Sequence, residues 1–128
     1  MIDDMGIFRT TISVAHIAHP SVRRQLEGIM VDTGSEYNWI PRFVLEELGI
    51  EPVRTDHFQT ADGRVLGREV GFALLYAGNR STATIVAFAE PGDMPLLGAI
   101  GLEGLNLRVD LGRKELVPAG PVPAATAA

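Results

Sequence analysis

The sequence predicts an all-β fold with one or two short helices. First, segments of alternating polar and apolar residues, rich in β-branched side chains, recur along the chain and are typical of strands. Second, turn sequences such as Asp62-Gly63 and Gly78-Asn79 separate these segments. Third, the 14 glycines and 8 prolines among 128 residues exceed average usage, which suits short strands joined by many turns.

The first part of the chain is predicted to form two strands followed by a helix. Residues 6–15 alternate in polarity, and residues 22–32 end in an apolar run that is typical of a buried strand. Residues 41–48 favour a helix because proline suits the first helical position and an apolar residue recurs at every fourth position. Gly49 is well placed to end that helix.

The second part is predicted to form two hairpins, a short helix and two final strands. The hairpins occupy residues 53–89, with turns at 61–64 and 77–80. A short helix is expected to follow Gly98 and to end near Leu105. The last two strands are expected at residues 107–111 and 115–118.

The length and composition predict a single domain. We expect it to span residues 1–118, and we expect the Pro/Ala-rich residues 119–128 to be disordered because they show no apolar period. The absence of cysteine excludes disulfides, thiol nucleophiles and cysteine-bound metals. A net charge of -5 argues against a nucleic-acid partner. No apolar run reaches the roughly 18 residues of a membrane span and the first residues do not resemble a signal peptide, so a cytoplasmic location is expected.

Metal and nucleotide sites receive little support from the sequence. His16, His19 and His57 lie in predicted loops or at strand ends and lack metal-ligand spacing, so solvated histidines are the simpler interpretation. The glycines between residues 98 and 104 lack the spacing and the following Lys-Ser/Thr of a phosphate-binding loop. We therefore expect no metal and no cofactor.

One short segment carries the chemistry. Asp32-Thr33-Gly34-Ser35 follows directly on the apolar run at 29–31, so a carboxylate is placed at the end of a buried strand beside hydroxyl groups and a glycine. Taken alone, this triplet is also compatible with an ordinary turn at the end of a strand. Its surroundings are therefore decisive.

A second motif lies further along the chain. Leu96-Leu97-Gly98 precedes the second predicted helix, and the hairpin turn at residues 59–64 lies between the two motifs. This order of elements resembles the single-domain, retropepsin-like aspartic proteases over residues 6–118. The resemblance implies a small, closed, barrel-like β-fold with a flap hairpin. The residues of this chain that match the flap are Thr60, Ala61, Asp62 and Gly63, and those that support the active-site loop from the second motif are Leu96, Leu97 and Gly98.

The resemblance also implies a role for each residue of the first motif. Asp32 is the catalytic carboxylate, Thr33 turns its hydroxyl inward to join two active-site loops, Gly34 donates an amide hydrogen bond, and Ser35 holds the outer oxygen of Asp32. Peptide hydrolysis by carboxylates needs a base that activates water and an acid that protonates the amide. Two carboxylates about 3 Å apart share one proton and supply both functions.

This chain contains only one such carboxylate motif, because no second Asp-Thr-Gly or Asp-Ser-Gly occurs. The resemblance therefore implies a homodimer with one Asp32 from each copy, acting on a peptide or protein substrate. Two departures from the retroviral pattern concern the dimer. Ser35-Glu36 replaces the usual Ala-Asp, and no arginine occurs between Gly98 and Asn106.

Two other interpretations stay open from the sequence. The chain could be a catalytically silent module of the same fold that binds peptides or dimerises, with Asp32 retained in a structural turn. It could also be an unrelated small β-domain in which Asp-Thr-Gly is coincidental.

Overall fold

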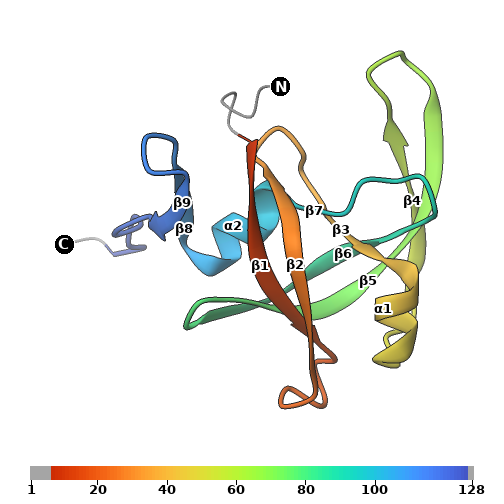
Figure 1. Ribbon diagram of the computed structural model, residues 1–128, viewed down its shortest axis with the longest axis horizontal. Coiled ribbons are helices and arrows are strands. Elements are labelled where there is room, and N and C mark those ends of the chain that lie inside the picture. Colours follow the sequence, from red (N-terminus) through yellow and green to blue (C-terminus); the bar gives the residue numbers. More distant parts are fainter. Residues whose placement is uncertain (1–6, 127–128) are drawn as a thin grey trace.

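The computed structural model describes residues 7–126, which fold mainly into strands (Figure 1). Residues 1–6 and 127–128, which include the start of the predicted domain and the end of the predicted tail, lie outside the described residues. The elements in chain order are β1 (Ile7–Ala15), β2 (Arg23–Asp32), β3 (Asn38–Pro41), α1 (Arg42–Glu47), β4 (Arg54–Gln59), β5 (Val65–Ala77), β6 (Arg80–Ala89), β7 (Leu96–Leu97), α2 (Ala99–Leu105), β8 (Leu107–Asp110) and β9 (Glu115–Pro118).

Seven strands form one sheet that closes on itself. Its order is β1-β2-β7-β3-β6-β5-β4, and β1 also pairs with β5 through residues 13–15, so the sheet is ring-like. The apolar faces of these strands meet inside the ring, where Val14, Val31, Leu75 and Phe88 are fully buried. The predicted all-β fold class with short helices is therefore confirmed.

The two motif segments are neighbours in this sheet. β7 pairs in parallel with β2, so that Leu96 lies opposite Met30 and Leu97 lies opposite Val31. β7 also contacts β3 through the antiparallel pair of Leu96 and Trp39. Parallel pairing needs a long crossover, and here the chain between the two strands supplies both hairpins. The fold thus brings the end of β2 and the start of α2 together.

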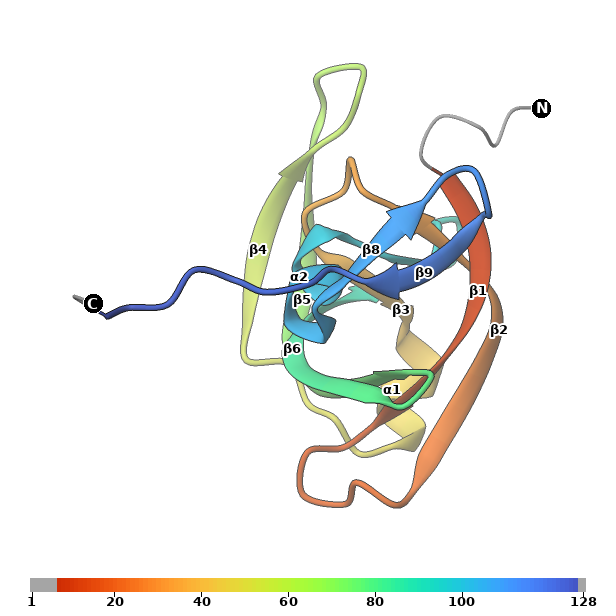
Figure 2. The ribbon, with the colours of Figure 1, turned by 90° about the vertical axis from the view of Figure 1, so that its left-hand side faces the viewer.

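The hairpin of β4 and β5 extends beyond the sheet. β4 pairs with β5 from Arg54 opposite Val70 to Gln59 opposite Val65. β5 begins to pair with β6 only at Val70. In both views the tip of this hairpin and the loop after β2 lie at the same end of the molecule (Figure 1) (Figure 2).

Most predicted elements are confirmed, with two short strands missed, β3 and β7. β3 was not expected, because its four residues are too few to show a strand period and the apolar Ile40 fits a helical repeat equally well. As a result Pro41 ends β3 and caps α1, where it was expected as the first helical residue. Gly49 follows the end of α1 with φ +75°, which is the conformation that glycine favours after a helix.

The C-terminal part packs on the ring as a helix and a separate hairpin. α2 buries Leu102 and Leu105, and the two-stranded sheet of β8 and β9 packs its apolar residues against the same core. Residues 119–126 form neither helix nor strand. In the part of the chain that the structure describes, neither helix is long and apolar enough to cross a membrane.

Candidate active site

Asp32 is the last residue of β2 and is held there by its own loop. The buried side chains of Ile29 and Val31 anchor the strand, while Asp32 is half-buried. The Gly34 amide donates a hydrogen bond to Oδ1 of Asp32 at 2.9 Å, and the Ser35 amide donates to the Asp32 carbonyl at 3.2 Å. A Cβ atom at Gly34 would lie 3.2 Å from Oδ1, so glycine allows this close approach. The carboxylate is thus oriented before any partner binds.

The remaining residues of the first motif have different surroundings. Thr33 is exposed at the tip of the loop, so its side chain is available for contact with another molecule. Ser35 Oγ donates a hydrogen bond to the carbonyl of Tyr37 at 3.2 Å. This contact differs from the predicted one with the outer oxygen of Asp32. In the single chain Ser35 therefore stabilises its own loop, because its hydroxyl binds a backbone carbonyl two residues further along.

The start of α2 binds the active-site loop through backbone groups. The Ala99 amide donates to the Ser35 carbonyl at 2.8 Å, and the Ile100 amide donates to the Glu36 carbonyl at 3.0 Å. These first amides of a helix have no partner within the helix, so the loop satisfies them. The backbone thereby joins the two motifs in a chain that has no arginine in α2.

Gly98 is required where the two motifs meet. A Cβ atom at this position would lie 2.2 Å from the Tyr37 carbonyl oxygen and 2.7 Å from the Ser35 carbonyl oxygen. Both neighbours are backbone atoms, which cannot move without moving the loop that carries Asp32. The glycine of the Leu96-Leu97-Gly98 motif therefore serves the close approach of two backbone segments.

Asn38 is the supporting residue that sequence reasoning missed. Its side chain is completely buried, and its Oδ1 accepts a hydrogen bond from the Gly98 amide at 3.0 Å. Its Nδ2 donates to the Ile85 carbonyl at 3.0 Å and lies 3.4 Å from Thr84 Oγ1. One amide side chain thus joins β3, β6 and the turn before α2. The available signal was an asparagine directly before the apolar pair Trp39-Ile40, where a buried polar residue needs partners.

The comparison with protein families agrees with this geometry. A family model described as aspartyl protease matches residues 27–103, which is more than half of the chain and contains both motifs and the hairpin between them. The chain belongs to this aspartyl protease family. The resemblance to retropepsin-like aspartic proteases that the two motifs carry is thereby confirmed. Among curated proteins, none matches the sequence.

The hairpin tip of this aspartic protease is ordered by its own polar side chains. Thr60 Oγ1 donates to the Asp62 carboxylate and accepts a hydrogen bond from the Arg64 amide, and Arg64 Nε lies 3.1 Å from Oδ2 of Asp62. The hydroxyl of Thr60, together with the Arg64 amide, holds the pKa of the Asp62 carboxyl below its usual value. Gly63 completes the turn with φ +90°. Ala61 is exposed at the same tip. The hydrogen bonds of its neighbours fix the backbone of the turn that presents it.

The lower part of the hairpin contacts the active-site loop of the protease. Tyr37 Oη donates to Oδ2 of Asp56 on β4 at 2.8 Å. The ring of Phe58, two residues further along β4, packs edge-on against both Tyr37 and Trp39 at centroid distances of 5.0 and 4.9 Å. The Asp56 carboxylate raises the pKa of the Tyr37 phenol, because the protonated phenol is the form that donates to it. The hairpin is thus anchored beside the loop of Asp32.

These residues define what the site can do in one copy of the chain. The site presents a single oriented carboxylate, a glycine amide and an exposed hydroxyl. Across residues 7–126, no group of three or more histidine or acidic side chains is arranged to hold a metal ion. One carboxylate can act as a base or as an acid at a given moment, and peptide hydrolysis needs both.

Proposed function

We propose that this aspartic protease is a homodimeric endopeptidase of the retropepsin type, in which Asp32 and Asp32 of the partner subunit form one active site. The observation that supports the proposal is the single Asp-Thr-Gly loop, whose carboxylate is oriented by the Gly34 amide and lies beside the second motif. A two-fold axis places identical residues opposite each other. Such an axis beside Asp32 supplies the second carboxylate that the chain itself lacks.

The proposed reaction uses the two carboxylates as a base and an acid. At any moment one Asp32 is ionised and the other is protonated, because two carboxylates at hydrogen-bonding distance share one proton. The ionised carboxylate takes a proton from water, whose oxygen attacks the carbonyl carbon of the scissile peptide bond. The protonated carboxyl donates its proton to the carbonyl oxygen and gives a tetrahedral diol. The carboxyl that took the proton from water then donates it to the amide nitrogen, while the other carboxylate takes a proton from one diol hydroxyl. The carbon–nitrogen bond breaks, which gives a carboxylic acid and an amine.

The positions of Thr33 and Gly34 support a contact between two active-site loops. Both residues are exposed in the single chain, although they adjoin the half-buried Asp32. In the proposed dimer each loop covers the other, and the Thr33 hydroxyl supplies a hydrogen bond across the axis. The Gly34 amide already donates to Oδ1, so the carboxylate keeps its orientation when the second loop approaches.

The proposed substrate is an extended peptide bound between the loop of Asp32 and the tip of the β4–β5 hairpin. Extended peptides add to a protein through main-chain hydrogen bonds, as an extra strand does, and alternate side chains enter pockets. The hairpin tip, with Thr60, Ala61, Asp62 and Gly63, lies at the same end of the molecule as the loop after β2 (Figure 2). We propose this tip as the flap that covers the peptide.

The test is the substitution Asp32→Asn. Asparagine keeps an oxygen for the Gly34 amide but cannot act as the base, so cleavage of unfolded casein at pH about 5 should be lost while the dimer mass in sedimentation equilibrium is unchanged. Asp110→Asn is the matched control, because Asp110 also ends a strand and accepts a backbone amide, from Arg113 at 3.1 Å, in a different hairpin.

Three results would separate the interpretations. Cleavage that survives Asp32→Asn, or a wild-type protein that is fully active as a strict monomer, contradicts the proposed mechanism. A wild-type dimer that cleaves nothing at any pH supports the catalytically silent module. A dimer structure in which the two Asp32 carboxylates lie far apart excludes the shared site.

A further inference from the structure

We propose that Arg68 and Asp93 form a positioning pair. The pair fixes the position of the flap hairpin relative to Asp32 and thereby sets the affinity for the peptide substrate. The proposal rests on the function proposed above, because it concerns the flap of that same site. Both residues lie outside the two sequence motifs, and they are 25 positions apart in the sequence.

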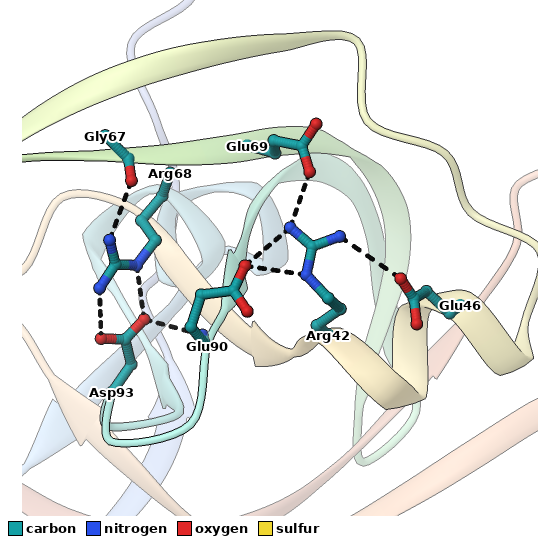
Figure 3. Close-up of polar contacts among 7 residues, drawn as sticks. All are labelled: Arg42, Glu46, Gly67, Arg68, Glu69, Glu90 and Asp93. Atoms are coloured by element: carbon teal, nitrogen blue, oxygen red, sulfur yellow. Dashed lines mark hydrogen bonds and ion pairs between the residues drawn. The ribbon is translucent and has the colours of Figure 1, made fainter.

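The contact between the two side chains is bidentate and largely shielded from water (Figure 3). Arg68 Nε lies 2.7 Å from Oδ2 of Asp93, and Arg68 Nη2 lies 2.9 Å from Oδ1. The side chains are only 19% and 15% exposed. Paired, charge-assisted hydrogen bonds of this kind fix both distance and direction. The pair therefore resists sliding and tilting of one segment against the other.

Asp93 is itself fixed within its loop. Its Oδ2 also accepts a hydrogen bond from the Glu90 amide at 2.8 Å, and its own amide donates to the Glu90 carbonyl at 2.9 Å. The turn of residues 90–93 is thus closed by both the backbone and the carboxylate. Residues 94 and 95 then lead into β7, whose Leu97 lies opposite Val31, the residue before Asp32. Asp93 is therefore tied through a short, ordered segment to the catalytic strand.

Arg68 lies in the part of β5 that extends beyond β6. Among the described strands, residues 65–69 of β5 pair only with β4, because the pairing with β6 begins at Val70. β4 is the last strand of the sheet order and lies at its edge. A two-stranded hairpin of this length is marginally stable when nothing packs against it. The position of the flap therefore depends on side-chain contacts below its tip.

These contacts reach both strands of the hairpin. Tyr37 of the active-site loop binds Asp56 on β4. The loop of residues 90–93 binds Arg68 on β5. Arg68 and Asp56 lie directly opposite each other in the hairpin register, so the two contacts are made at the same height below the flap tip. The first contact starts from the active-site loop, and the second starts from the loop that leads into β7, the strand paired with β2. Together they fix the flap relative to the strand that carries Asp32.

A neighbouring arginine also joins β5 to the loop of residues 90–93 (Figure 3). Arg42, the first residue of α1, lies 2.7 Å from a carboxylate oxygen of Glu69 on β5 and 2.8 Å from one of Glu90. It also contacts Glu46 and lies over the ring of the buried Phe88. Glu69 and Glu90 are more exposed, at 44% and 37%, than the Arg68–Asp93 pair. Arg68 and Asp93 are therefore the better shielded of the two connections.

The experiment measures peptide cleavage and flap mobility in the full-length protein with Arg68→Gln. A quenched fluorescent peptide, taken from a site that the wild-type protease cleaves in casein, is assayed at pH about 5. We expect KM to rise about tenfold with kcat within about twofold, because a loosened flap weakens binding of the peptide but leaves the two carboxylates in place. Hydrogen exchange at residues 60–64 should become about tenfold faster, while exchange in β1 and β2 stays the same.

Two further variants keep the test specific. Arg113→Gln is the control, since it removes the exposed ion pair of Arg113 with Glu115 in the β8–β9 hairpin and should change neither KM nor exchange at the flap tip. Arg68→Lys keeps the charge and should recover part of the wild-type KM, as expected for a positioning role. If Arg68→Gln proves too unstable to assay, Arg68→Lys and Glu69→Gln must show smaller shifts in the same direction.

Specific outcomes would overturn the proposal. A fall in kcat with unchanged KM would place Arg68 in the chemical step, and exchange at residues 60–64 equal to that of Arg113→Gln would mean that the pair does not hold the flap. The exchange measurement needs no activity, so it separates the two proposals. If the wild-type protein cleaves nothing, the proposed function fails, whereas faster exchange in Arg68→Gln still shows that Arg68 and Asp93 hold the hairpin.

Discussion

The amide nitrogen of Gly98 lies 3.0 Å from Oδ1 of the fully buried Asn38, in a hydrogen bond between residues 60 positions apart in the sequence. On the other side of Gly98, the carbonyl oxygens of Ser35 and Tyr37 leave no room for a side chain. The loop that carries Asp32 is therefore in contact with the turn before α2 on two sides. Its geometry is a property of both motifs together.

The first prediction concerns Gly98→Ala. The added methyl group would lie 2.2 Å from the Tyr37 carbonyl, so the active-site loop must move. We expect a loss of about 3 kcal/mol in the free energy of unfolding. A shift of the loop on the order of 1 Å should lower kcat by about 100-fold. Gly112→Ala is the control, because its added Cβ meets only Oδ1 of Asp110 at 3.6 Å. Wild-type kcat in Gly98→Ala would contradict the prediction.

The second prediction concerns Asn38→Ala. The substitution leaves the Gly98 amide and the Ile85 carbonyl buried without their present partners. Each unpaired buried group costs about 1–3 kcal/mol, so for these two groups the free energy of unfolding should fall by about 2–6 kcal/mol in urea denaturation. Asn79→Ala, at an exposed position in the turn before β6, should change it by less than about 0.5 kcal/mol. Equal effects of the two substitutions would show that the buried amide is dispensable.

Local patterns were sufficient to predict the strand that ends at Asp32 and the helix that follows Gly98. The structure confirms the apolar run before Asp32 as the end of β2 and residues 99–105 as α2. The Asp-Gly turn at residues 62–63 likewise predicted the hairpin tip. Each of these signals lies within a few neighbouring residues, which is the range over which periodicity and turn chemistry act.

The supporting contacts could not be predicted because they depend on long-range pairing. Asn38 finds its partners only when β3 lies between β6 and β7, and β3 itself is too short to show a period. Arg68 and Asp93 meet because the fold brings β5 next to the loop after β6. In the sequence both are ordinary surface charges, which are usually solvated. Their roles follow from topology, which no local pattern specifies.

The third prediction concerns the ionisation of Tyr37. Its phenol donates to the Asp56 carboxylate, which raises its pKa above the ordinary value of 10.0. In a Tyr76→Phe background Tyr37 is the only tyrosine, so ultraviolet absorbance of the phenolate reports it alone. We expect a titration midpoint above 10.0 that falls when Asp56→Asn is added, because the negative charge is lost and Arg54 remains nearby. Asp62→Asn, at the tip of the same hairpin, should leave the midpoint unchanged.

The sign of the linked stability effect follows from the same shift. A phenol whose pKa is raised in the folded state contributes stability that is fully present below its unfolded pKa and is lost as the pH rises through the folded pKa. The Tyr37–Asp56 contact should therefore be intact at neutral pH and should weaken in alkali as Tyr37 ionises. It should also weaken in acid, as the pH falls through the pKa of Asp56, which Arg54 and Tyr37 hold below its ordinary value of 3.8. A midpoint that is insensitive to Asp56→Asn would mean that the contact is absent in solution.

The fourth prediction concerns the pH dependence of the Arg68–Asp93 pair. Arg68, with help from the Glu90 amide and against the effect of burial, holds the pKa of the Asp93 carboxyl below its ordinary value of 3.8. A depressed carboxyl pKa contributes stability that is present above the unfolded value and is lost as the pH falls through the folded value. At pH about 7 we therefore expect Asp93→Asn to lower the free energy of unfolding by about 1.5–3 kcal/mol, the range for hydrogen bonds to charged groups.

The difference between wild type and Asp93→Asn should shrink as the pH falls below 3.8, because protonated Asp93 can no longer form the ion pair that the variant lacks. Thermal unfolding of the wild type and the variant at the same protein concentration, from pH about 7 to about 2, measures the change. Glu115→Gln removes an exposed pair with Arg113 and should cost less than about 1 kcal/mol throughout. A difference for Asp93→Asn that stays constant over this range would show that Asp93 acts through its amide-accepting oxygen rather than through its charge.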